Sequence, residues 1–323
     1  MLSKPGFFNE LVAPADLRDL FDPPLPPPPA AGPPYSGGPP TLAGDLTPER
    51  EGRPLKELCA LITGLPLSEA EKLVEFGSMW LNNSRVEDPS FPLPPKGSFR
   101  LNFPEYGPVK FYEGSPDRII FEDSDVIVYD KESGRPSQGV PYDSYNNVHS
   151  ALTRRRGLFL RLPHRLDLGT SGFLLLAKNQ RAAGFLGKSF QRGAVSKRYL
   201  ALATGEAPQW REKDVEINIA RIQNRFTVRE NGPGLPSRTS FKLLSAQDGL
   251  LLFLAVPHTG RTHQIRLHLS HLGYPIMGDN FYGGEIHPRL MLRASGLSFT
   301  HPTSRLPVVL GGPFEEAVEG GSA

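Results

Sequence analysis

A charged loop around Asp167 is the strongest candidate for chemistry in the sequence. Residues 163–172 read PHRLDLGTSG and lead into the apolar run FLLLAKN, a pattern that predicts a turn feeding a buried strand. Catalytic groups are commonly placed on loops that a rigid sheet holds. Because Asp167 lies between Leu166 and Leu168, we expect its carboxylate to be partly desolvated, and a nearby cation would then keep it ionised. An isolated Asp in such a loop can equally be a turn or helix-capping residue.

Two later segments offer an aromatic ring and a cation. Tyr199 lies in the alternating run KRYLALATG, which predicts a strand. Arg266 lies in HQIRLHLSHLG, which predicts a helix that ends at Gly273. A guanidinium beside Asp167 would keep that carboxylate ionised. Taken alone, Tyr199 fits an ordinary strand residue and Arg266 an exposed helix arginine.

Metal and hydrolytic chemistry have little support in the sequence. Of the four histidines between residues 258 and 271, only His268 and His271 are spaced i,i+3, and no cysteine accompanies them because Cys59 is the only one in the chain. A glycosidase would need a second acid close to Asp167, and the surrounding sequence offers none. We therefore expect neither a metal nor a cofactor.

The composition divides the chain into three parts. Residues 1–49 hold thirteen of the 34 prolines, which predicts a disordered tail or spacer because proline cannot donate to helix or sheet ladders; an SH3-type ligand is a second reading. Residues 50–104 combine two helical patterns with short strands and predict a small α/β domain. Residues 105–318 carry many strands and few long helices, which predicts an α+β domain around a mostly antiparallel mixed sheet.

The distribution of charge favours a polyanionic partner for the last part of the chain. The overall charge is +2, but residues 1–50 carry −3 and residues 51–105 carry −2, which leaves +7 for residues 106–323. A merely solvated surface would give the same count. We expect a cytoplasmic protein without membrane contact, because no apolar run is long enough to span a bilayer and the first residues lack a secretory pattern.

Three blocks of the sequence resemble the RluA-like family of pseudouridine synthases. HRLDLGTSG matches the family signature HRLD-x-x-TSG at every fixed position. SKRYLALATG around Tyr199 resembles the second family block, and HTGRTHQIRLHLSHLGYPIMGDNFYGG around Arg266 resembles the third. The resemblance covers residues 115–303 or so, with Lys131 in the register of the family's lysine loop, although Glu132 stands where the family usually has proline.

This resemblance implies a role for each candidate residue. Asp167 would be the essential carboxylate, acting either as a nucleophile or as a base. Arg266 would pair with Asp167, and Tyr199 would lie against the target base. Ile265 would pack on the uracil ring, although it could equally be a core residue of the same helix. Arg165 would fill the space left by the extruded base, or else contact a phosphate.

Residues 50–104 resemble a degenerate S4-type RNA-binding domain. The helix that should face RNA carries Glu69, Glu71 and Glu75 against a lone Lys72, and acidic groups repel phosphates. RNA binding and a purely structural packing role are therefore both open for this segment.

Together these features predict a cofactor-free isomerase, monomeric, that converts specific uridines of structured RNA to pseudouridine. The S4-like segment favours large-subunit ribosomal RNA as the substrate. A tRNA pseudouridine synthase and a non-catalytic RNA-binding or chaperone protein are the alternatives. Residues 211–238, which carry five arginines, are a candidate insert for recognising the RNA.

Overall fold

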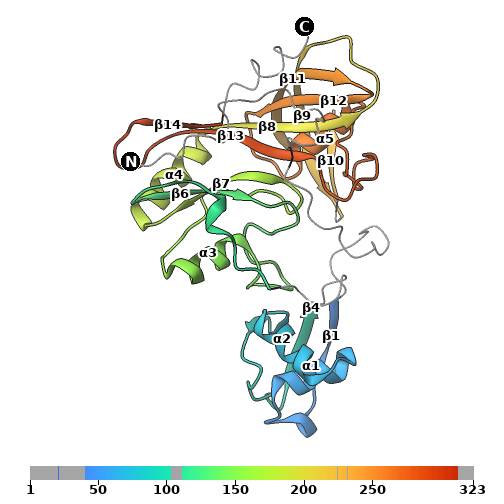
Figure 1. The fold of residues 1–323 in the computed structure, drawn as a ribbon. Helices are drawn as coiled ribbons and strands as arrows, with labels where there is room; N and C mark the ends of the chain where they lie inside the picture. The colour runs from blue at the N-terminus through green and yellow to red at the C-terminus, as the bar shows by residue number, and fades with distance from the viewer. Residues whose placement is uncertain (1–20, 22–40, 103–110, 224, 231, 312–323) are drawn as a thin grey trace. The chain divides into compact units, whose positions relative to one another are not determined.

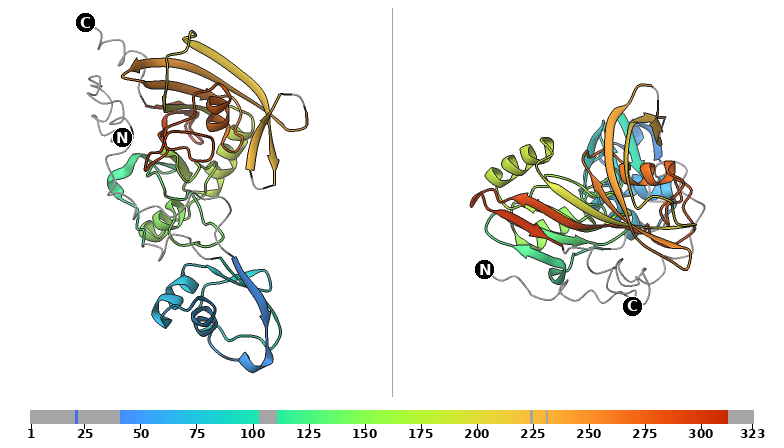
Figure 2. Two further views of the ribbon diagram at one scale, coloured as in Figure 1. Left: turned by 90° about the vertical axis from the view of Figure 1, so that its right-hand side faces the viewer. Right: turned by 90° about the horizontal axis from the view of Figure 1, so that it is seen from above.

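The computed structural model describes residues 21, 41–102, 111–223, 225–230 and 232–311. The chain forms two compact units, drawn in Figures 1 and 2: a smaller one from residues 31–114 and 136–158, and a larger one from residues 1–30, 115–135 and 159–323. Among the helices of the described ranges, none is long and apolar enough to cross a membrane.

The smaller unit contains a four-stranded antiparallel sheet with helices packed on one face. Its elements, in the order of the chain, are β1 (Thr41–Leu46), η2 (Pro48–Arg50), α1 (Leu55–Thr63), α2 (Leu67–Glu75), β2 (Met79–Leu81), β3 (Ser84–Val86) and β4 (Gly97–Asn102), with the sheet order β1-β4-β2-β3. Leu55 and Leu58 of α1 meet Leu73 of α2 and Met79 and Leu101 of the sheet in one apolar core. Gly64, in the left-handed conformation at φ 71°, ends α1 as the sequence predicts.

Strand β1 corrects the boundary predicted for the Pro-rich tail. Residues 41–49 were predicted to belong to the tail, yet residues 41–46 pair with β4 over their whole length and Leu46 is buried. The physical reason is local composition: no proline interrupts residues 41–47, so each residue of the strand can donate to the ladder. Of residues 1–40 of the predicted tail, all but Phe21 lie outside the described residues.

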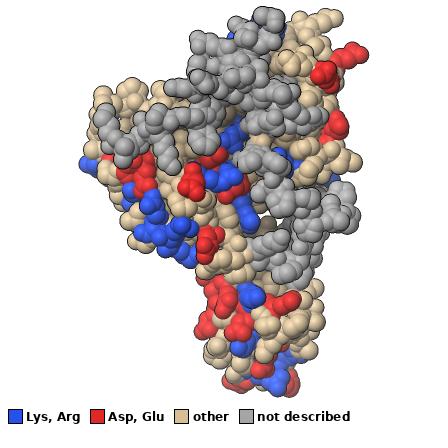
Figure 3. Space-filling model, viewed as in Figure 1, with Lys and Arg blue, Asp and Glu red and all other residues tan. Residues whose placement is uncertain are grey.

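A short segment from later in the chain docks on the smaller sheet. The carbonyl of Tyr142 accepts from Ser78 Oγ at 2.7 Å, that of Pro141 from Trp80 Nε1 at 3.0 Å, and that of Val140 from Arg85 at 2.7 Å. Helix α3 (Val148–Arg156) follows and ends in three arginines, and Lys and Arg side chains gather over it in Figure 3. This unit therefore includes a basic helix that the sequence placed in the second domain.

The larger unit is built on one ten-stranded sheet. Its strands are β5 (Ile119–Glu122), β6 (Val126–Lys131), β7 (Ser171–Ala177), β8 (Ser196–Thr204), β9 (Glu212–Ile222), β10 (Arg225–Arg229), β11 (Leu235–Gln247), β12 (Leu250–Pro257), β13 (Leu292–Thr300) and β14 (Pro307–Leu310). The order is β10-β9-β11-β12-β8-β13-β7-β6-β5, with β14 paired to β13. All of these pairings are antiparallel except β13 with β7, so the predicted α+β fold with a mostly antiparallel mixed sheet is confirmed.

Burial explains why the centre of this sheet is almost wholly apolar. Every residue of β6 and β7 is buried, and α4 (Gln180–Gln191) covers one face of these strands through Ala182 and Leu186. Helix α5 (Gln264–His271) lies near β10, β11 and β12 (Figure 1). At the parallel junction, Gly172 has φ 100°, and a Cβ there would lie 2.1 Å from the Ala294 carbonyl oxygen. The glycine of the TSG sequence is thus required by a close backbone approach.

Candidate active site

The loop that carries Asp167 is held from behind by the end of β6. Lys131 is fully buried, and its ammonium donates to the carbonyls of Glu132, Arg135 and Leu168 at 2.9, 2.7 and 3.2 Å. The hydroxyl of Ser133 donates to the Gly169 carbonyl at 2.7 Å. Two residues that directly follow Asp167 are thereby fixed, and the Asp167 side chain remains 34% exposed.

His164, the first residue of the HRLD sequence, has a structural role. Its Nε2 accepts a hydrogen bond from the Leu175 amide at 3.0 Å, and its ring stacks on Phe190 with centroids 4.6 Å apart. Burial, together with the charge of Lys197, lowers the pKa of His164 to about 3. The neutral imidazole therefore ties the loop to strand β7.

Arg266 of α5 is paired with Asp279 rather than with Asp167. Its Nε and Nη2 donate to the two carboxylate oxygens of Asp279 at 2.7 and 2.8 Å, and both side chains are buried. Burial opposes the charge of Arg266, but the hydrogen bonds and charge of Asp279 outweigh it, and the charge of Asp167 adds to them, so the pKa of Arg266 is raised. Among the described residues no ion pair or hydrogen bond joins Arg266 to Asp167, whose charge nevertheless stabilises the guanidinium, so their direct pairing stays a prediction.

Among the described residues, His263 is the basic side chain that lies within 4.0 Å of the Asp167 carboxylate. Its Nε2 lies 4.0 Å from Asp167 Oδ2, and its Nδ1 lies 2.8 Å from the Tyr282 hydroxyl. The residue adopts φ 57° at the N-terminus of α5, a conformation that is uncommon outside glycine. Burial and the nearby charge of Arg266 lower the pKa of His263, so its ring is neutral at neutral pH.

Tyr199 lies on β8, opposite Ala255 of β12 and Ala294 of β13. It is buried, and burial together with the negative charge of Asp167 raises the pKa of its phenol well above the usual range. The phenol is therefore protonated at neutral pH. That electrostatic coupling also places Tyr199 in the neighbourhood of Asp167.

The two residues predicted to touch substrate lie in contrasting environments. Ile265 is 6% exposed on α5, beside Arg266, which fits a core residue as well as a contact to uracil. Arg165 is exposed on the loop, two residues before Asp167. The structure thus gathers Asp167, Tyr199 and Arg266 around one centre and leaves Arg165 free to reach outward.

Sequence reasoning missed three residues of this centre: Asp279, Tyr282 and the site role of His263. The histidine was considered only as a zinc ligand, and the segment GDNFYGG was treated as part of a family block. One signal was available, because a buried arginine requires a carboxylate and Asp279 is the first acid that follows Arg266 in the sequence.

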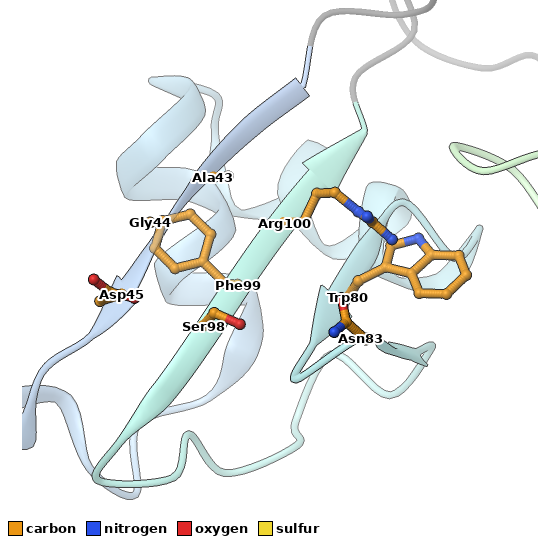
Figure 4. A pocket seen from close by; sticks show the side chains of 8 residues that line it. All are labelled: Ala43, Gly44, Asp45, Trp80, Asn83, Ser98, Phe99 and Arg100. Carbon is orange, nitrogen blue, oxygen red and sulfur yellow. The ribbon is translucent and has the colours of Figure 1, made fainter.

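Two other places in the described chain could attract a ligand. Asp123, Asp125 and His301 have ligand atoms within 4.8 Å of one another, but Asp123 already bonds His301 and the backbone, and Asp125 bonds Asn179. On the smaller sheet, a hollow of about 430 Å³ is lined by Trp80 and Arg100 among others (Figure 4). Neither place shares a residue with the centre around Asp167.

Comparison with known proteins defines the class of this chain. A profile of the family described as RNA pseudouridylate synthase matches residues 125–271. The protein named ribosomal large subunit pseudouridine synthase C of Vibrio vulnificus is 35% identical over 215 residues, which are 63% of this chain and 67% of that protein. The protein of the same name in Escherichia coli K12 is 30% identical over 289 residues, 80% of this chain and 88% of that protein.

Solved structures agree with this class. Human RNA Pseudouridylate Synthase Domain Containing 1 aligns with a TM-score of 0.52 at 29% identity, over 62% of this chain and 85% of that chain. Human RNA Pseudouridylate Synthase Domain Containing 4 shares the fold, with a TM-score of 0.50 at 22% identity, over 62% of this chain and 91% of that chain. The chain belongs to the RNA pseudouridylate synthase family, so the resemblance seen in the sequence is confirmed and the enzyme is an isomerase that acts on RNA.

Proposed function

We propose that this enzyme converts uridines of large-subunit ribosomal RNA to pseudouridine, with Asp167 as the essential carboxylate. The observation that carries the proposal is a partly exposed Asp167 on a rigidly held loop, next to the buried Arg266–Asp279 pair. The relatives from Vibrio vulnificus and Escherichia coli are named for the ribosomal large subunit, which supports the choice of RNA. tRNA is the alternative substrate, and a non-catalytic RNA chaperone is disfavoured because the chain carries Asp167, Tyr199 and the Arg266–Asp279 pair.

The reaction breaks the bond between ribose C1′ and uracil N1 and rejoins the ring to C1′ through C5. The hydrogen at C5 is lost to a base and N1 gains a proton, so atoms and electrons balance without an oxidant or a water. No step therefore requires a cofactor or a metal. Asp167 can attack as a nucleophile or accept a proton as a base, and its charge is favoured by Arg266 in either role.

The other residues are assigned by position. Tyr199, as a protonated phenol in the electrostatic reach of Asp167, would stack on the detached base and exchange a proton during C5 deprotonation. Ile265 would contact the same ring from α5. Arg165, exposed beside Asp167, would occupy the gap left by the extruded uridine, since extraction of a base costs a few kcal/mol of unstacking.

The remaining proposals concern the rest of the chain. Residues 50–104 would be an S4-like domain, and residues 105–318 the catalytic domain. The hairpin within residues 211–238 would recognise RNA, and its arginines support this. We further propose a monomer that works in the cytoplasm, which size-exclusion chromatography and cell fractionation would test.

The experiment that tests the choice of substrate is pseudouridine mapping in ribosomal RNA and tRNA from cells with and without this chain. The proposal expects the loss of one or more sites in large-subunit ribosomal RNA and their return when the wild-type chain is restored. Loss of pseudouridine sites in tRNA alone would show that tRNA, the alternative, is the substrate. Sites unchanged in both RNAs would contradict the proposed activity.

A further inference from the structure

An aromatic cluster lies beside Asp167 and is not used by the proposed chemistry. The His263 ring is at its centre, with centroid distances of 5.8 Å to Phe226, 5.6 Å to Tyr282 and 6.4 Å to Phe281. The same His263 places Nε2 4.0 Å from Asp167 Oδ2. One member of the cluster, His263, is therefore an immediate neighbour of the candidate catalytic carboxylate.

Phe281 is the member of this cluster that faces solvent. It is 42% exposed, although it lies only two residues after the buried Asp279. Its ring is also 6.4 Å from that of Tyr282, and the guanidinium carbon of Arg266 lies 5.7 Å from its centroid. A single exposed apolar side chain needs no explanation, but an exposed ring that packs on a half-buried aromatic cluster next to the candidate active site offers a preformed stacking surface.

The β9–β10 hairpin, which brings Phe226 into this cluster, also carries positive charge. Phe226 belongs to β10, and Arg225, its neighbour in the sequence, is exposed, as is Arg221 at the end of β9. The charge of Arg225 also reaches Tyr282, whose pKa it lowers against the larger effect of burial. Arg266 is bound to Asp279, so we take the exposed hairpin arginines as the candidates for phosphate contacts.

We propose that Phe281, in the cluster that it forms with Phe226 and Tyr282 around His263, is a stacking site for an unpaired nucleobase that adjoins the target uridine. This inference rests on the proposed function, because extraction of the uridine is what leaves a neighbouring base without its stacking partner. An aromatic face accepts any base, so the site stabilises the opened RNA and does not read its sequence. The phosphates that flank the stacked base lie toward Arg225 and Arg221.

The test uses a short oligouridine with the fluorescent base 2-aminopurine placed next to the central uridine. Stacking on Phe281 should quench its fluorescence when the full-length protein binds. Phe281→Leu should remove that quenching and weaken binding about tenfold, which corresponds to about 1.4 kcal/mol. Phe281→Tyr should retain both, because it keeps the ring. Ile286→Ala is the matched control: Ile286 is 91% exposed on the same loop and should change neither signal.

Each outcome has a separate meaning for the stacking site and for the proposed function. The binding assay does not require turnover, so it can be repeated with Asp167→Asn, in which the quenching should persist. If Phe281→Leu quenches and binds as the wild type does while pseudouridine still forms, the stacking site is refuted and the proposed function stands. The opposite outcome is also possible: the wild-type protein makes no pseudouridine, yet Phe281→Leu abolishes the quenching. That result would support the stacking site and refute the proposed function.

Discussion

The carboxylate of Asp279 holds the guanidinium of Arg266 by two parallel hydrogen bonds of 2.7 and 2.8 Å. The pair is buried, so Asp279 fixes the orientation of the Arg266 guanidinium before any substrate binds. This arrangement gives Arg266 a fixed position and leaves its charge to act on Asp167. It also makes Asp279 a positioning residue for the proposed reaction.

Removal of Asp279 should therefore damage both stability and turnover. Asp279→Asn leaves a buried guanidinium without its anion, and we expect the free energy of unfolding to fall by about 3 kcal/mol. Activity at a temperature where the variant is folded should also drop, while RNA affinity changes little. Chemical denaturation and single-turnover kinetics would measure the two effects. Asp214→Asn is the control, because Asp214 pairs with Arg238 at the surface and should be nearly silent.

The pKa of His164 predicts how stability responds to acid. Its folded-state pKa of about 3 lies below the ordinary value of 6.5, so the unfolded chain binds the proton more readily. The contribution of His164 is complete above pH 6.5 and is lost as the pH falls toward 3. Between pH 7 and pH 5 the loss should be about 2 kcal/mol. His164→Gln should flatten this dependence in denaturation curves, and an unchanged slope would contradict the structural role.

The ammonium of Lys131 predicts an effect on turnover without a direct contact to substrate. Lys131→Met would leave three carbonyls, including that of Leu168, without this donor. We expect the loop of Asp167 to loosen, so kcat should fall at least tenfold while KM changes less. Ser133→Ala, which removes one bond to the same loop, should have a smaller effect, of about 1 kcal/mol on stability. A variant of Lys131 with wild-type kcat would show that the loop is positioned by other contacts.

Strand β1 predicts a difference between two truncations. Removal of residues 1–48 deletes the strand that covers the edge of β4 and exposes the core around Leu46, whereas removal of residues 1–40 keeps both. The longer truncation should be less stable than the shorter one by about 2 kcal/mol or more. Thermal unfolding of both proteins would measure this. Equal melting temperatures would mean that the strand contributes nothing to the smaller unit.

The sequence predicted the elements that carry the candidate site well because their signals are local. The strand after Asp167, the strand of Tyr199 and the helix of Arg266 each carry a clear apolar period, and the structure has all three. The boundary at β1 was misplaced because a strand of six residues, exposed along most of its length, has almost no hydrophobic pattern.

The pairing of Arg266 had a weaker signal, since the sequence offered Asp279 only as the first acid that follows the arginine. Asp279 lies thirteen residues beyond Arg266 on an irregular loop, and only the folded chain decides which of two acids lies closer to the guanidinium. The family resemblance favoured Asp167 as the partner of Arg266. In the folded chain Arg266 is buried, and its partner is Asp279, a carboxylate that is itself inaccessible to water. His263 was missed because its position depends on an unusual positive φ that the sequence does not reveal.

The central claim is that Asp167 performs the chemistry, and Asp167→Asn tests it most directly. The amide keeps the size of the side chain and removes its charge, and the side chain is exposed enough for the fold to tolerate the change. The measurement is pseudouridine formation in large-subunit ribosomal RNA under single-turnover conditions, with RNA binding measured in parallel. The account predicts no detectable pseudouridine with RNA binding largely retained, since affinity comes mainly from phosphate contacts. A rate within tenfold of the wild type would contradict it.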